Sequence, residues 1–71
     1  MWVYVRSGRN AFNLDHVSRL YVEETGAGAA LKAEFAGKTI LVHYFSAKAD
    51  AQVALDQIME QNEAGAAIVH M

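Results

Sequence analysis

The chain has 71 residues, of which 54% are hydrophobic and 20% charged, and its formal net charge at pH 7 is -2. A chain of this length supports a single core, because it buries only about 60% of its unfolded surface, and its apolar content excludes a disordered polar segment. The absence of Cys excludes disulfides and thiolate metal sites, and the weak negative charge gives no overall attraction to nucleic acid.

The first predicted element is a strand over residues 2–5, where aromatic and β-branched residues precede the turn-forming pair Ser7 and Gly8. Residues 10–14 are expected to return beside this strand. Asp15 is suited to bond nearby backbone amides, which predicts a short helical turn over residues 16–18.

Three further strands are predicted in the middle of the chain. Apolar and polar residues alternate over residues 19–24 and again over 31–35, with a glycine-containing reversal between them. Residues 39–45 are apolar on both sides, which is typical of a central strand covered on each face. We expect the helix and a second subunit to provide that cover.

A single amphipathic helix is predicted over residues 47–62, with Ser46 as its N-cap. Its apolar stripe is formed by five residues: Ala51, Ala54, Leu55, Ile58 and Met59. Gly65 is a stop signal, and residues 64–71 form an apolar tail that would be costly to leave in water.

These elements predict one α+β domain over residues 1–71. Its sheet would be an antiparallel β-meander of four or five strands within residues 1–45, packed by the C-terminal helix.

The sequence offers no set of catalytic or metal-binding residues. His16, His43 and His70 are too far apart in the chain for a recognised ligand motif, and no Ser or Thr lies in a nucleophile motif. The run from Gly26 to Gly28 is followed by a predicted strand instead of the helix that a phosphate-binding loop requires. We therefore expect neither an enzyme nor a bound cofactor or metal.

Two groups of residues are candidates for binding partners. The first is an aromatic and basic face on neighbouring strands, made of Trp2, Tyr4, Arg6, Arg9, Arg19 and Tyr21. The second is a candidate self-association surface, made of Leu41, His43, Phe45, Ile68 and Val69.

Three segments carry a resemblance: NLDHVSRLYVEE over residues 13–24, AEF over 33–35 and SAKADA over 46–51. In this pattern the chain resembles small uncharacterised bacterial and phage proteins in which a short turn leads into a β-meander and a closing helix. The resemblance covers residues 1–62 and implies the fold. These proteins have no assigned activity, so it implies no function.

The leading hypothesis is a non-enzymatic protein-interaction module that self-associates as a homo-oligomer. One alternative is a phage or mobile-element inhibitor of a host defence protein, similar to an anti-CRISPR protein. The other is nucleic-acid binding through the aromatic and basic face, which is not favoured. No run approaches the roughly 20 apolar residues of a membrane span, so we expect a cytoplasmic location without membrane association.

Overall fold

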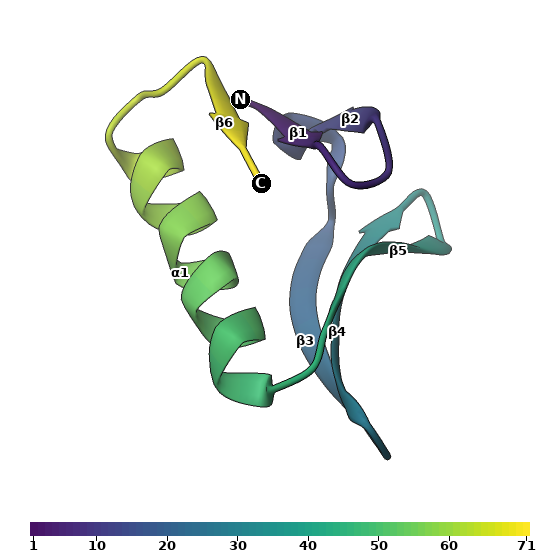
Figure 1. Cartoon of the computed structure of the whole chain (residues 1–71). Coiled ribbons are helices and arrows are strands. Elements are labelled where there is room, and N and C mark those ends of the chain that lie inside the picture. The colour runs from purple at the N-terminus through teal and green to yellow at the C-terminus, as the bar shows by residue number, and fades with distance from the viewer.

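The computed structural model describes residues 1–71 and contains six strands in two three-stranded sheets, together with one long helix (Figure 1). The elements are β1 (Trp2–Val5), β2 (Asn10–Asn13), the 3₁₀ turn η1 (Leu14–His16), β3 (Arg19–Thr25), β4 (Gly28–Phe35), β5 (Lys38–Phe45), α1 (Lys48–Glu63) and β6 (Ile68–His70). The α+β class and the antiparallel meander are confirmed. The single sheet of four or five strands is wrong, because the strands divide into two sheets.

The first sheet has the strand order β2-β1-β6, and it joins the two ends of the chain (Figure 1). β1 pairs with β2 antiparallel and with β6 parallel. The Trp2 amide donates to the Ala67 carbonyl at 2.9 Å, and the Met71 amide donates to the Tyr4 carbonyl at 2.8 Å. The expected apolar tail is therefore a strand of the fold.

The second sheet is the meander β3-β4-β5, so its central strand is β4. Leu31 in β4 is fully buried, whereas Leu41 in β5 is 58% exposed. The expectation that residues 39–45 form a central strand covered on both faces is wrong, because β5 lies at the sheet edge and one of its faces is exposed at Leu41 and Tyr44. A register irregularity opposite Leu31 and Lys32 leaves Val42 unpaired as an extra residue.

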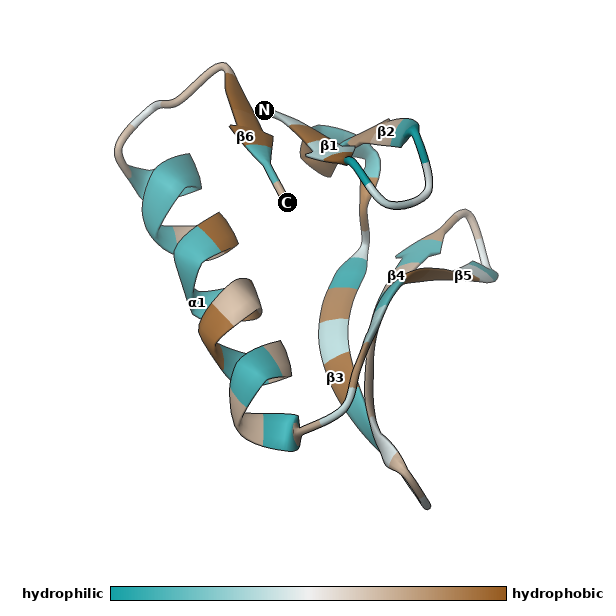
Figure 2. Cartoon of the chain, in the orientation of Figure 1, coloured by the Kyte–Doolittle hydropathy of each residue, from teal (hydrophilic) through white to brown (hydrophobic).

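Alternating polarity along β3 decides which face of the second sheet enters the core, and Figure 2 shows this alternation. Leu20 and Val22 pack against the core cluster. The buried cluster itself combines both sheets and the helix: Val3, Val5, Phe12, Leu31, Ala33, Val42 and Ile58. One core thus lies between the two sheets and α1.

The helix α1 spans Lys48–Glu63, within one residue of the predicted range. Of its predicted apolar stripe, Ala51 and Ile58 are buried and Met59 is 40% exposed. Ser46 is not the N-cap. Ala47 takes that position without any side-chain hydrogen bond, and Lys48 instead pairs with Glu24 of β3 at 3.3 Å.

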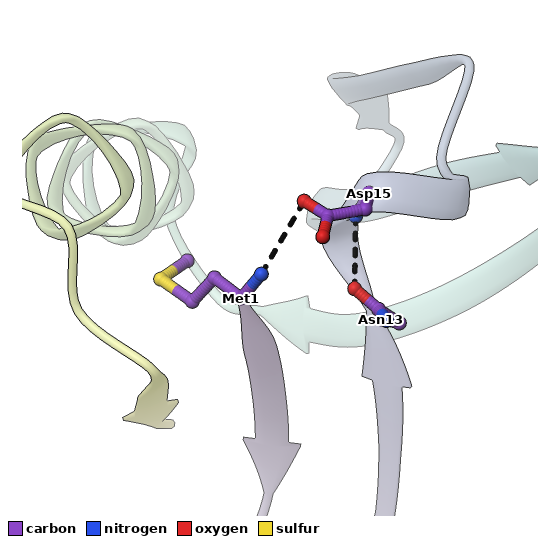
Figure 3. Close-up of polar contacts among 3 residues, drawn as sticks. All are labelled: Met1, Asn13 and Asp15. Carbon is purple, nitrogen blue, oxygen red and sulfur yellow. Dashed lines mark hydrogen bonds and ion pairs between the residues drawn. The ribbon is translucent and has the colours of Figure 1, made fainter.

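A short polar network anchors η1 to the start of β1 (Figure 3). The Asn13 side chain accepts a hydrogen bond from the Asp15 amide at 3.0 Å, which is the capping geometry that begins a helical turn. The Asp15 carboxylate lies 3.3 Å from the amino group of Met1. The turn falls at Leu14–His16, slightly earlier than predicted, and Asn13 is its capping residue.

Candidate functional site

The six residues of the predicted aromatic and basic face belong to two separate sheets. Trp2 and Tyr4 lie on β1 and Arg6 follows it, whereas Arg19 and Tyr21 lie on β3. β1 and β3 are not neighbouring strands, so the expected continuous face across them is wrong. Each sheet instead presents its own outer surface.

The outer surface of the first sheet is an uncharged patch that we call the Trp2 face. Val3 and Val5 point into the core, so the alternate residues Trp2 and Tyr4 point away from it. Their partners in register complete the patch: Ala11, Asn13, Ile68 and His70. No Asp, Glu, Lys or Arg is among these six residues.

Large side chains on the Trp2 face are substantially open to water. Trp2 and Ile68 are directly opposite each other in register, and each is 49% exposed. Tyr4 and His70 form the next pair, with ring centroids 5.7 Å apart. Two adjacent cross-strand pairs therefore create one contiguous apolar and aromatic surface.

Two arginines border the Trp2 face at the β1–β2 turn. Arg6 and Arg9 are exposed and form no ion pair. The Arg9 amide donates to the Arg6 carbonyl at 3.2 Å, and Arg9 adopts a φ of 49°. This is the left-handed residue that commonly follows a type I turn in a hairpin.

Paired charges occupy the part of the second sheet's outer surface that β3 and β4 form. The Arg19 guanidinium lies 4.2 Å from the centre of the Tyr21 ring and 3.9 Å from Glu34. Lys32 donates to Glu23 at 2.9 Å, and this hydrogen bond raises the pKa of Lys32 against a smaller opposing effect of burial. Arg19 is therefore engaged within its own sheet.

The predicted self-association residues also divide between surfaces. Leu41 lies on the outer surface of the second sheet, paired with Lys32, and Ile68 belongs to the Trp2 face. His43, Phe45 and Val69 line a pocket of about 300 Å³ between β5, α1 and β6, which we call the β5–β6 pocket. Its remaining lining residues are Ala54, Gln57, Ile58, His70 and Met71.

A hydrogen bond beside this pocket joins two residues, Ser7 and His43, that no sequence motif connects. The Ser7 hydroxyl lies 3.1 Å from Nδ1 of His43, which joins the β1–β2 turn to β5. No Asp or Glu side chain lines the pocket, so none orients the imidazole there as in a catalytic triad. The contact fixes the ring of His43, which also packs edge-on against Phe45 at 4.7 Å.

The structure shows neither a cluster of metal-ligating side chains nor a helix that could span a membrane. No group of three or more His, Asp or Glu side chains is arranged to hold a metal ion. The helix α1 has neither the length nor the apolar character to cross a bilayer.

The geometry defines a small α+β domain with an uncharged aromatic sheet face and an apolar pocket at a strand edge. No protein-family model matches the chain, and comparison with curated proteins and with solved structures found no match either.

Proposed function

We propose that the chain is a non-enzymatic protein-interaction module that self-associates through the Trp2 face. The observation that carries this proposal is the adjacency of Trp2 and Ile68, each about half exposed, as a registered pair on an open sheet surface. Exposed apolar clusters of this kind mark interaction sites in soluble proteins. Trp and Tyr are also the residues enriched at binding hot spots.

A second copy of the chain is the occupant that suits this face best. Because the six residues of the face include no Asp, Glu, Lys or Arg, two copies of it can meet across a two-fold axis without like-charge repulsion between them. The outer surface of the second sheet differs in this respect, since its Arg19, Lys32 and Glu23 would need exact charge matching.

The size of the core is a further reason for self-association. Only 10 of 71 residues are buried, and a core of this size typically contributes about 3–5 kcal/mol. Covering Trp2 and Ile68 in a dimer would add apolar burial that the single chain lacks.

Nucleic-acid binding is the second candidate, supported by the position of Arg6 and Arg9 beside Trp2 and Tyr4. Unpaired guanidiniums next to exposed rings can contact phosphates and stack bases. The support is limited to these two arginines, because Arg19 is engaged with Tyr21 and Glu34 on the other sheet. Binding of this kind would weaken steeply with added salt, whereas apolar self-association would not.

The experiment is sedimentation velocity of the wild-type chain from micromolar to millimolar concentration, compared with Trp2→Glu and Leu41→Glu. We expect the wild type and Leu41→Glu to form the dimer and Trp2→Glu to remain monomeric. Leu41→Glu is the matched control, because it adds the same charge at an exposed residue outside the Trp2 face.

The single Trp provides an independent readout, since its emission should shift to shorter wavelength as concentration rises and Trp2 leaves water. A wild-type chain that stays monomeric throughout, or two variants that dimerise equally, would contradict the proposal. A monomer that binds a heterologous partner, such as a host defence protein, would favour the inhibitor hypothesis instead.

A further inference from the structure

The strand β6 has one paired edge and one open edge. The Ala67 carbonyl accepts from the Trp2 amide, and Met71 donates to the Tyr4 carbonyl and accepts from the Arg6 amide. In an extended strand, alternate residues direct their amide and carbonyl groups to opposite edges. Ile68 and His70 therefore present their backbone donors and acceptors on the side of β6 that faces away from β1.

The β5–β6 pocket lies along this open edge. The ring of His70 packs against Tyr4 on the Trp2 face, yet His70 also lines the pocket. The pocket thus extends around the edge of the strand from its inner side, where Val69 points toward the core. A peptide segment that formed hydrogen bonds with the backbone of β6 would lie next to this pocket.

The chemistry of the pocket favours an uncharged occupant. Phe45, Ile58 and Val69 supply apolar walls, and no Asp, Glu, Lys or Arg is among the eight lining residues. A volume of about 300 Å³ is at the lower end of small-ligand pockets and has room for a large apolar side chain.

The edge of β6 carries no charge, proline or bulge, which are three of the features by which natural sheets discourage strand pairing. β6 has only three residues, so an added strand would form its hydrogen bonds at Ile68 and His70 alone. β5 has Lys38 and an unpaired Val42, and β3 has several charged residues along its length. β6 consists of Ile, Val and His and pairs with β1 without a register break.

From these observations we infer that β6 and the β5–β6 pocket bind an extended segment of a partner protein by strand addition, with one apolar side chain of that segment in the pocket. Main-chain hydrogen bonds to Ile68 and His70 hold the segment, and the pocket selects its side chain. The site uses the edge of β6, whereas the proposed dimer uses its outer face. The inference therefore does not depend on self-association.

The first test uses a short acetylated and amidated peptide in which threonine alternates with valine or leucine. Amide hydrogen exchange of the monomeric Trp2→Glu chain is measured by NMR with and without this peptide. We expect new protection at the amides of Ile68 and His70. The Val69 amide, on the paired side of the strand, should change little. Equal changes at all three amides, or no change, would overturn the inference.

A second test separates strand addition from general apolar binding. Two versions of the peptide carry N-methyl groups on alternate residues, one version on the odd and one on the even positions. Only one edge of the peptide faces β6, so one version should lose binding and the other should keep it. If both versions bind equally, the backbone is not the element recognised.

A third test fills the pocket. Ala54→Phe places a ring among the lining residues, and Val53→Phe is the matched control on the exposed side of α1. We expect Ala54→Phe to weaken peptide binding by about tenfold or more and the control to leave it unchanged. Circular dichroism verifies that both variants are folded. Equal affinity of the two folded variants would exclude the pocket from the site.

Discussion

Replacing Leu31 with alanine should destabilise the fold far more than the same change at Leu41, although both residues are leucines in adjacent strands. Leu31 is fully buried in β4, and burial losses of this kind cost about 2–5 kcal/mol. Leu41 is 58% exposed, so less than half of the roughly 1.5–3 kcal/mol for complete burial is at stake. We expect Leu41→Ala to cost about 1 kcal/mol or less.

Urea denaturation followed by circular dichroism at low protein concentration measures this difference. With a slope near 1 kcal/mol per molar urea, Leu31→Ala should lower the midpoint by about 2 M or more. Since that variant is at risk of being unfolded in water, Ile58→Val gives a milder test of the same core, with an expected cost of about 0.5–1.5 kcal/mol. Equal losses for Leu31→Ala and Leu41→Ala would refute the placement of Leu31 in the core and of Leu41 on the exposed face.

Three other predictions concern individual contacts. Gly28→Ala should cost about 2 kcal/mol in thermal unfolding, because its Cβ would overlap the Phe45 carbonyl oxygen, whereas Gly26→Ala should be tolerated in open space. Asp15→Asn should cost no more than about 1 kcal/mol, and less at high salt, because the carboxylate is 70% exposed. The hydrogen bond to Glu23 raises the pKa of Lys32. The contribution of this pair to the stability of the fold is therefore complete below the unfolded pKa of about 10.4 and is lost as the pH rises through the folded pKa. The difference in unfolding free energy between the wild type and Lys32→Met should therefore be constant from neutral pH to about pH 10 and shrink as the pH rises further, and a difference that grows at high pH would contradict this.

Local patterns in the sequence were sufficient to predict the meander and the helix. Strict alternation over residues 31–35 reports a strand with one buried face, and β4 has that arrangement. The 3.6-residue spacing of Ala51 and Ile58 likewise identifies the buried side of α1. Such signals depend only on neighbours within one element, so they can be interpreted without knowing the rest of the fold.

The prediction for residues 39–45 was wrong because β5 contains a bulge, which interrupts the alternation of side chains between the two faces. Val42 is in the core cluster, and the next residue, His43, lines the pocket with helix residues. The extra residue places both side chains on one side of the sheet and returns Leu41 and Tyr44 to the other. If the side chains of residues 39–45 alternated strictly between the two faces, both faces would be apolar and covered, but the face that carries Leu41 is open to water.

The division into two sheets could not be predicted from local sequence patterns, because it depends on pairing between the two ends of the chain. β6 has three residues, too few for a periodic signal, and its partner β1 is more than sixty positions away. The contact between Ser7 and His43 is also long-range and leaves no motif. Trp2 is 49% exposed, but which residues share its face follows only from the register of the sheet.

The position of β6 connects the two proposed binding surfaces to the stability of the fold. Val69 contributes to the core, Ile68 to the Trp2 face, and the strand backbone to the open edge beside the pocket. β1 is its only neighbouring strand, so local opening of β6 would disrupt all three at once. A ligand on either surface binds only when β6 is docked, and therefore opposes that opening. The two sites should then favour each other's occupancy through the strand that they share, without any direct contact between the ligands.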